Sequence, residues 1–198
     1  MSVSKIDIRR SMRQRRAALS AADLRQAEGG LLRQLRNSPI LRKARTIALY
    51  WPMRGEIGAL PILQLPWSHR QRFFLPVLAG LHATELRFAP FSVGTTLSKN
   101  RLGIPEPEVP RRYWKSAAEL DLLLLPLVAF DATGQRLGMG GGFYDRSLAA
   151  LRHRRHWRRP RLVGVAHAFQ EVRELPTEPW DIPLDAIATE REYRSFRR

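Results

Sequence analysis

The sequence predicts an α/β fold: one domain over residues 1–198, built as a three-layer, open and mostly parallel sheet with helices on both faces. Three observations predict it. Short apolar runs alternate with helical stretches along the chain. Residues 121–128 form a continuous Leu/Val run, as expected for a strand buried on both faces of a parallel sheet. A loop with five glycines then leads into a helix, and such sheets bind ligands at the carboxyl ends of their strands.

The N-terminal part of the chain predicts two helices. Over residues 4–16, Ile8 and Met12 recur four positions apart, which is the spacing of one helix face. Ser20 is a favoured N-cap residue and predicts a second helix that runs to about Arg36. The first helix also carries a basic face, formed by Lys5, Arg9, Arg13 and Arg16.

The remaining residues predict strands that alternate with helices. Short apolar runs, bounded by polar or turn residues, predict strands at residues 46–50, 72–77, 85–88, 121–128, 162–166 and 184–188. Helices are predicted at residues 56–65, beginning near Gly55, and from residue 143 to about residue 154. Residues 90–110 are rich in Gly and Pro and predict a long loop.

The charge balance is far from neutral. The chain has 34 Lys and Arg against 18 Asp and Glu, which gives a net charge of +16. Such a field attracts polyanions, and nucleic acid, nucleotides and polyglutamylated or phosphorylated small molecules all qualify. Charge alone does not choose among them.

The absence of cysteine excludes disulfides, a thiolate nucleophile and cysteine-based zinc sites. A reducing compartment fits this composition. No apolar run is long enough to cross a bilayer, and the basic N-terminus has no apolar stretch of the kind a signal peptide needs. The sequence therefore predicts a cytoplasmic protein without a membrane partner, and we expect a monomer.

The most informative stretch is FDATGQRLGMGGGFYDR at residues 130–146. Its glycines permit positive φ and close approach of an anion, so the pattern suits phosphate. Arg136 and Asp145 bracket the loop with a cation that pairs with phosphate and a carboxylate that suits Mg²⁺. The loop matches neither the Walker A motif nor the dinucleotide fingerprint. The alternative is a glycine-rich turn that only packs a helix on a strand.

Together with its flanks, this stretch resembles the signature of the 5-formyltetrahydrofolate cyclo-ligase family, also called methenyltetrahydrofolate synthetases. Other segments follow in the family's order and extend the resemblance over essentially the whole chain: KIDIR at 5–9, YWPMRGEI at 50–57, GIPEP at 103–107, VGVAHAFQ at 163–170 and EPWDIPLDAIATE at 178–190. The glycine-loop motif is specific, whereas the other segments are weak one by one.

The resemblance implies an enzyme with a Rossmann-like layered sheet that uses ATP and Mg²⁺. The implied reaction is cyclisation of 5-formyltetrahydrofolate, with or without a polyglutamate tail, to 5,10-methenyltetrahydrofolate with release of ADP and phosphate. In that reaction the formyl oxygen is activated by phosphoryl transfer and then displaced by attack of N10. The protein's share is positioning and charge neutralisation.

The resemblance also implies site residues. ATP contacts fall on Lys5, Arg9, Arg136, Leu137, Gly138, Met139, Gly140, Gly141, Gly142, Phe143 and Tyr144. Of these, the catalytic candidates are Arg136 and Tyr144. Folate contacts fall on Trp51, Glu56, Met139, Gly140, Gly141, Gly142 and Phe143. The magnesium positions fall on Asp145 and Asp185, with Asp131 and Asp181 as nearby alternatives. Many family members carry a basic residue where Met139 stands, so this loop has lost one potential cation contact.

Without the resemblance, several of these residues have simpler interpretations. Lys5 and Arg9 would form a solvated helix face, and Glu56 would be an acid at a helix start that interacts with the helix dipole. His167 follows a predicted strand and is more often structural than a general base.

The arginine-rich run at residues 152–161 has no role in the family. It predicts a solvated loop, or else an anion-binding patch for RNA or a polyglutamate tail. A basic nucleic-acid-binding module is therefore the competing hypothesis, and a folate-binding protein without activity is a third.

Overall fold

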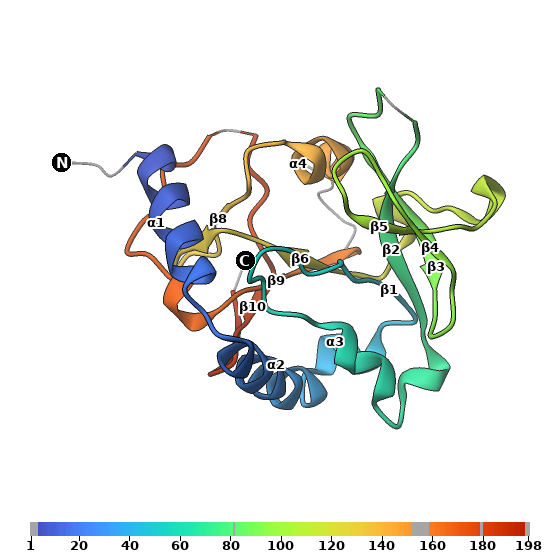
Figure 1. Cartoon of the computed structure of the whole chain (residues 1–198), viewed down its shortest axis with the longest axis horizontal. Helices are drawn as coiled ribbons and strands as arrows, with labels where there is room; N and C mark the ends of the chain where they lie inside the picture. Colours follow the sequence, from blue (N-terminus) through green and yellow to red (C-terminus); the bar gives the residue numbers. More distant parts are fainter. Residues whose placement is uncertain (1–3, 81, 152–158, 179, 197–198) are drawn as a thin grey trace.

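The structure is a computed structural model that describes residues 4–80, 82–151, 159–178 and 180–196. These residues form a seven-stranded sheet with the strand order β11-β10-β9-β6-β1-β2-β3 (Figure 1). The five inner strands are parallel, and β11 and β3 pair antiparallel at the two edges. The strands are β1 (Thr46–Ala48), β2 (Arg72–Leu78), β3 (Leu86–Phe91), β6 (Leu122–Pro126), β9 (Arg161–Val165), β10 (Ala186–Ala188) and β11 (Tyr193–Ser195). The predicted open, mostly parallel sheet is confirmed.

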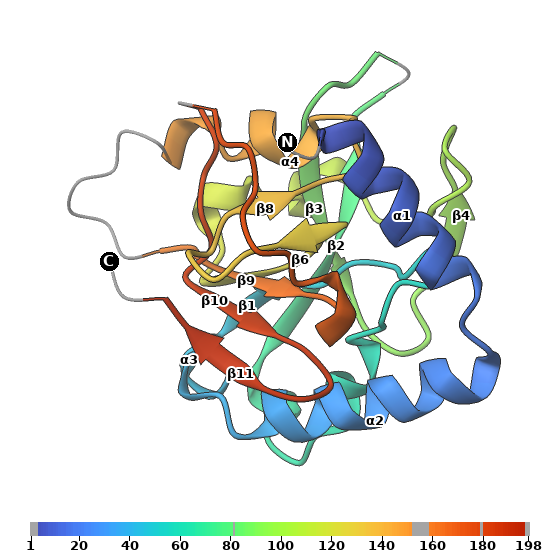
Figure 2. The same cartoon turned by 90° about the vertical axis from the view of Figure 1, so that its left-hand side faces the viewer.

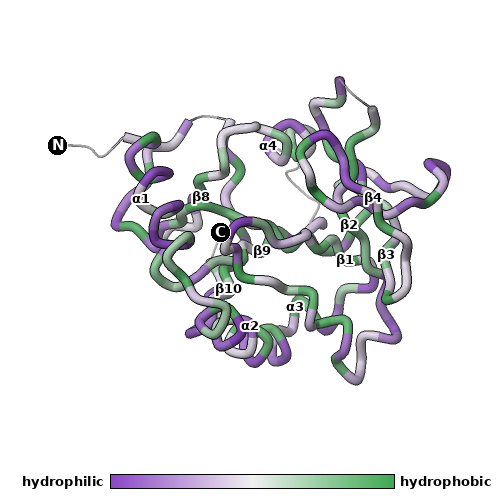
Figure 3. Tube along the Cα trace, in the orientation of Figure 1, coloured by the Kyte–Doolittle hydropathy of each residue, from purple (hydrophilic) through white to green (hydrophobic). Residues whose placement is uncertain are grey.

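Both faces of the sheet are covered, as the unbroken apolar character of β6 predicted. Leu122 and Leu124 face a core that also contains Leu31 and Leu35 from α2. Leu123 and Leu125, which alternate with them, face a second core, against which Tyr144 of α4 packs. Figure 3 shows the same division, since the inner strands are hydrophobic while α1 and α2 alternate polar and apolar residues along their length. Helices therefore form the outer layers on both faces.

The helices begin where the sequence places N-cap residues. Ser4 accepts a hydrogen bond from the Asp7 N–H, and Ser20 forms a capping box with Asp23. None of the helices formed by the described residues combines the length and the apolar character that crossing a membrane requires. Their bounds are α1 (Lys5–Ala17), α2 (Ala21–Arg36), α3 (Pro39–Lys43) and α4 (Phe143–Ser147).

Two small hairpins lie outside the main sheet. One is formed by β4 (Leu97–Lys99) and β5 (Pro105–Pro107), within the segment that the sequence predicted as loop. The other is formed by β7 (Ala129–Phe130) and β8 (Arg136–Leu137), directly after β6. Helix α1 packs Ile8 and Met12 on this second hairpin, and Figure 2 shows α1 beside β8. Helix α1 therefore covers the start of the glycine-rich segment and not the central sheet.

Two helix predictions need correction. Residues 56–65 do not form an α-helix, and only Leu60–Gln64 coil into a short 3₁₀ helix, η1. Pro61 lies in its first turn and has no N–H to donate, so apolar periodicity misled the prediction. The helix predicted from residue 143 is shorter, because α4 ends at Ser147 and a 3₁₀ turn follows at Ala149–Leu151. The rest of that prediction, and most of the arginine-rich run, falls on residues 152–158, outside the described residues.

The strand order reverses between β1 and β6. After β1 the chain continues to β2 on one side, and after β6 it continues to β9 on the other. The loops that leave these two strands therefore diverge at the carboxyl ends of β1 and β6. In open α/β sheets this point is where ligands bind. It brings together residues 49–59 and residues 127–142.

Asp121, at the opposite end of these strands, is expected to contribute to the stability of the fold. Asp121 accepts hydrogen bonds from the N–H groups of Arg45 (2.8 Å) and Thr46 (3.0 Å) and pairs with Arg159 (2.6 Å). Burial is the largest influence and raises the pKa of Asp121, but these donors together hold it below its usual value. We expect Asp121→Ala to lower the free energy of unfolding by about 2 kcal/mol at neutral pH.

The pH dependence of this effect follows from the sign of the shift. A depressed pKa in the folded state stabilises the protein above the pKa of an unfolded Asp, about 3.9, and the gain is lost as pH falls through the folded-state value. Urea unfolding of Asp121→Ala and of the unsubstituted protein, at pH 7 and at pH 3, measures this contribution to stability. The difference in the free energy of unfolding between the two proteins should be smaller at pH 3 than at pH 7, and a constant difference would contradict the assignment. The exposed Glu174→Ala is the matched control.

Candidate active site

The glycine-rich loop joins β8 to α4 at the carboxyl end of the sheet. Gly140 and Gly142 have φ angles of +102° and +66°, in the left-handed region that favours glycine. Gly142 is the residue at which α4 begins. The path of the loop therefore depends on glycine at these two positions, and glycine also leaves the loop backbone open to close approach of a ligand.

Two arginines of helix α1 donate hydrogen bonds to this loop. Arg9 donates from Nε to the carbonyl of Gly138 at 2.9 Å, and Arg13 donates to the carbonyl of Met139 at 3.2 Å. The Arg9 guanidinium also lies against Gly140, at 3.8 Å from the place of a β-carbon there. The predicted meeting of Arg9 with the loop is thus present in the fold, since α1 packs on the hairpin that precedes it.

Arg136 and Asp145 meet across the two ends of the loop. Their side chains form an ion pair with Nη2 and Oδ1 2.6 Å apart. The Arg136 side chain is 6% exposed, whereas that of Asp145 is 39% exposed. The Arg136 Nε is buried and has no hydrogen-bond partner among the described residues. A buried guanidinium with a spare donor is well suited to an anion that the protein itself does not supply.

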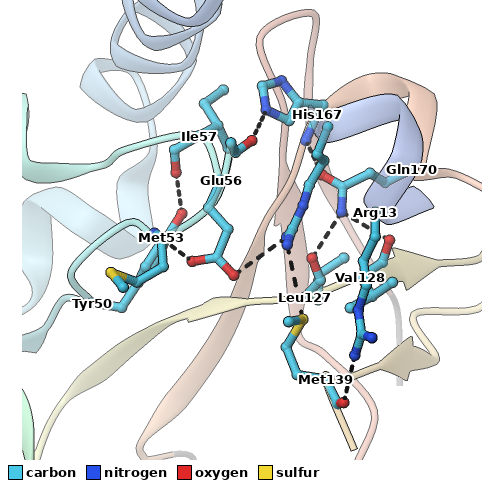
Figure 4. A network of polar contacts seen from close by, with 12 residues as sticks. Arg13, Tyr50, Met53, Glu56, Ile57, Leu127, Val128, Met139, His167 and Gln170 are labelled. Atoms are coloured by element: carbon cyan, nitrogen blue, oxygen red, sulfur yellow. Dashed lines mark hydrogen bonds and ion pairs between the residues drawn. The ribbon is translucent and has the colours of Figure 1, made fainter. Parts of the chain in front are cut away.

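Glu56 lies in the loop that follows β1. Its side chain is 11% exposed, with Oε1 3.3 Å from Arg16 Nη1 and Oε2 accepting from the Met53 N–H at 3.1 Å. Burial raises the pKa of Glu56, while the Met53 N–H and the Arg16 guanidinium oppose that rise. Figure 4 shows the Glu56 carboxylate and the Met139 sulfur linked to the same guanidinium, that of Arg16. The loops after β1 and β6 therefore share Arg16 of α1 as a contact.

Tyr144 of α4 lies near the Glu56 carboxylate. Burial raises the pKa of Tyr144 well above its ordinary value, and the Glu56 carboxylate raises it further. The phenol therefore stays protonated throughout the physiological range and can only donate or accept a hydrogen bond as a neutral group.

His167 supports the loop after β1 from the other side. Its Nε2 lies 3.0 Å from the Gly55 carbonyl, and its ring stacks on Phe169 with centroids 5.1 Å apart. Burial lowers the pKa of His167, so the ring is neutral at neutral pH. These contacts fit the structural interpretation of this histidine.

The two predicted magnesium positions differ in the freedom of their oxygens. Asp185 uses one oxygen for Arg161 (3.0 Å) and the other for the Leu162 N–H (2.8 Å). Asp145 uses only Oδ1, and no partner of Oδ2 is found among the described residues. Over the described ranges, no three His, Asp or Glu side chains gather closely enough to hold a metal by themselves. A metal would therefore need further oxygens from a ligand such as phosphate.

The alternative aspartates have structural partners. Asp131 is 2% exposed and accepts from Thr133 and Gln135 through Oδ1 and from the Leu175 N–H through Oδ2. Asp181 accepts from the Glu178 N–H at 2.8 Å.

Some predicted residues point elsewhere in this structure. Lys5 lies 3.6 Å from Glu178 and 3.9 Å from Asp181, near the C-terminal segment. Leu137 turns its side chain into the core beneath α1. Trp51 packs against the core on the α2 face of the sheet. Phe143 is the first residue of α4, and its ring folds back to 3.1 Å from the place of a Gly141 β-carbon.

Sequence reasoning missed Arg16 as a site residue. It assigned Arg16 to the basic face of the first helix, yet the side chain is only 2% exposed and contacts Glu56. A signal was available, because Arg16 follows Met12 by four positions and so continues the apolar stripe that begins at Ile8. Arg13, on the same helix, was likewise not assigned to the loop.

A separate cleft of about 880 Å³ opens at the other end of the parallel strands, where β2 begins. It is lined by Phe73, Phe91, Tyr113 and Trp114, among others. None of the predicted site residues lines it.

Comparison with known proteins supports the resemblance. The sequence model of the 5-formyltetrahydrofolate cyclo-ligase family matches residues 1–190. The 5-formyltetrahydrofolate cyclo-ligase of Escherichia coli K12 is 39% identical over 178 residues, which cover 90% of this chain and 96% of that protein. The protein of the same name from Haemophilus influenzae is 40% identical over 179 residues, covering 89% of this chain and 92% of the relative.

Solved structures show the same fold. The NMR structure of Aquifex aeolicus 5,10-methenyltetrahydrofolate synthetase superimposes with a TM-score of 0.80 at 30% identity, covering 98% of this chain and 93% of that one. A Mycoplasma pneumoniae 5,10-methenyltetrahydrofolate synthetase, at 24% identity and a TM-score of 0.73, supports the fold alone. Taken with the family match over residues 1–190, these similarities show that the chain belongs to the 5-formyltetrahydrofolate cyclo-ligase family.

Proposed function

We propose that this protein converts 5-formyltetrahydrofolate to 5,10-methenyltetrahydrofolate, with hydrolysis of ATP to ADP and phosphate and with Mg²⁺. One observation carries the proposal beyond family membership. A glycine-rich loop that begins at a buried arginine, Arg136, and the loop that carries the buried carboxylate of Glu56 both contact Arg16 of α1, at the point where the strand order reverses. A phosphate donor and a molecule with hydrogen-bond donors would thus be held side by side.

The glycine-rich loop is the proposed ATP site. Arg136 has a spare buried donor for a phosphate oxygen, and Arg9 lies against Gly140. Lys5 would have to leave Glu178 to reach the same phosphates. The proposed ATP contacts are otherwise the loop residues from Arg136 to Tyr144.

The loop after β1 is the proposed folate site. Glu56 can accept hydrogen bonds from the donor edge of the pterin ring. Trp51, close to it in the chain, and Phe143, at the end of the glycine-rich loop, would supply aromatic surface. Residues 139–143 would contact the folate from the other side.

Asp145 fits the proposed magnesium site. It is partly exposed and has one oxygen without a partner in the described part of the chain, and Mg²⁺ in nucleotide sites often takes one or two carboxylates together with phosphate oxygens. Asp185 would have to release Arg161 or the Leu162 N–H to serve as the second ligand. When bound, the ion supplies positive charge against the phosphates.

The proposed chemistry activates an unreactive amide oxygen. Transfer of the γ-phosphoryl group of ATP to the formyl oxygen gives an imidoyl phosphate and ADP. N10 then attacks the activated carbon and loses its proton, and departure of phosphate leaves the methenyl bridge. Arg136 would balance the charge that develops on the transferred group, while Tyr144 offers a neutral hydroxyl and the loops hold both substrates in contact.

The test is absorbance at the methenyl band after mixing the protein with 5-formyltetrahydrofolate at neutral pH. We expect the band to rise only when both ATP and Mg²⁺ are present, with one ADP formed for each methenyl group. A chain that binds the folate but produces no band when ATP and Mg²⁺ are both present would contradict the proposed activity.

A further inference from the structure

Arg16 is a buried arginine with very few partners. It lies in the last turn of α1, four residues after Met12, and its side chain is 2% exposed. Its Nη1 is 3.3 Å from Glu56 Oε1, and its Nη2 is 3.9 Å from the sulfur of Met139. Its Nε has no hydrogen-bond partner among the described residues. A buried guanidinium is costly unless its charge is paired, and here the pairing carboxylate is Glu56.

The backbone of Arg16 also fixes the loop that carries Glu56. Gly55 has a φ of +76°, and a β-carbon there would lie 2.6 Å from the Arg16 carbonyl oxygen. The Gly55 carbonyl in turn contacts His167 on the far side. The turn before Glu56 is therefore held between the end of α1 and the end of β9. In Figure 4 the dashed lines from Glu56 and from Met139 end on one guanidinium, that of Arg16.

We propose that Arg16 is a positioning residue for folate: it orients the Glu56 carboxylate toward the pterin donors and couples that carboxylate to the glycine-rich loop through Met139. This inference rests on the proposed function, in which Glu56 contacts the folate. Arg16 acts through Glu56 and does not itself touch the reacting atoms. Its loss should therefore weaken binding of folate and leave binding of ATP nearly unchanged.

The charges around Glu56 predict how its titration responds. Arg16 faces it from α1, Tyr50 from the loop after β1 and Tyr144 from α4. Both phenols are neutral at physiological pH, since burial raises the pKa of each. Arg16 is thus the charged side chain that opposes the effect of burial on Glu56. Without it the pKa of Glu56 rises, and the ionised carboxylate is lost at a higher pH than in the unchanged protein.

The experiment is a double-mutant cycle with Arg16→Met, Glu56→Gln and the double variant. The dissociation constant of 5-formyltetrahydrofolate is measured by calorimetry without ATP, and KM is measured for each substrate. We expect Arg16→Met to raise the folate dissociation constant and KM about 10-fold at pH 7, while the KM for ATP changes less than about 2-fold. In the Glu56→Gln background, Arg16→Met should change folate binding less than about 2-fold, because the two residues act as a unit.

Two further readouts separate positioning from a general structural role. The pH below which folate binding weakens should move upward in Arg16→Met and vanish in Glu56→Gln. Arg16→Lys should restore part of the affinity, because it keeps the charge, and it carries the test if Arg16→Met does not fold. Arg10→Met, a substitution at an exposed position of the same helix, is the matched control and should leave the folate dissociation constant and both KM values unchanged.

The outcomes keep the two proposals apart. An equal loss of folate affinity on Arg16→Met with and without Glu56 would overturn the positioning role while leaving the activity in place. An unchanged affinity in Arg16→Met would do the same. If the unsubstituted protein forms no methenyl product, the proposed function fails, and the role of Arg16 fails with it.

Discussion

Replacing Arg136 by methionine should lower kcat about 10³-fold with little change in the fold. Arg136 is buried, pairs with Asp145 at 2.6 Å and keeps one Nε donor without a partner in the described part of the chain. In the proposed reaction this guanidinium faces the charge that develops on the transferred phosphoryl group. Arginines in that position contribute about 10³ or more to phosphoryl-transfer rates. Because the interaction strengthens in the transition state, kcat should fall far more than affinity for ATP does.

Steady-state formation of the methenyl band, with both substrates varied, measures this effect. Arg136→Lys should recover only a small part of the rate, since a lysine keeps the charge but loses the planar fork of donors. Arg70→Met, at an exposed position outside the site, is the matched control. A kcat within about 10-fold of the original would show that Arg136 serves only as the partner of Asp145.

Replacing Asp145 by asparagine should raise the Mg²⁺ concentration that gives half-maximal rate at least about 10-fold and lower kcat about 100-fold. The substitution removes the negative charge of a carboxylate whose Oδ2 has no partner among the described residues. Its amide oxygen can still accept from Arg136, so the loop should keep its geometry. The loss should therefore report on the cation and not on the loop, because hard divalent cations prefer charged oxygen ligands.

Titrations of rate against Mg²⁺ at saturating ATP and folate test this expectation. Thermal unfolding of Asp145→Asn should match that of the unsubstituted protein within a few degrees. Glu174→Gln, which removes an exposed carboxylate elsewhere, is the control for the loss of one negative charge. An unchanged Mg²⁺ requirement in Asp145→Asn would reject Asp145 as a ligand, whatever happens to kcat.

Much of the fold follows from local sequence. The first two helices begin at Ser4 and Ser20 because a capping hydroxyl and an amphipathic spacing are properties of a few adjacent residues. The inner strand β6 was also predictable, because a continuous apolar run of this length is typical of a strand that is covered on both faces. The failure at residues 56–65 came from weighing apolar spacing above Pro61, which leaves only the short helix η1.

Less of the candidate site could be predicted from local sequence. The glycine-rich loop and its flanking Arg136 and Asp145 are close in sequence, so their meeting was predictable. Lys5 and Arg9 are also close in sequence, on one predicted helix face. Yet Arg9 reaches the loop and Lys5 reaches Glu178, because the direction of α1 is set by its packing on the β7–β8 hairpin.

The sequence by itself determined the class of fold, the start of each early helix and the loop that marks the site, because hydrogen bonding, capping and apolar spacing act over a few residues. Only the tertiary structure decided that Glu56 lies against Arg16. Arg13, Arg15 and Arg16 have the same side chain and the same helical propensity, and the spacing from Met12 indicates only that Arg16 lies on the apolar face of α1. The carboxylate that pairs with it comes from a loop 40 residues further along the chain, and that pairing depends on contacts between residues far apart in sequence.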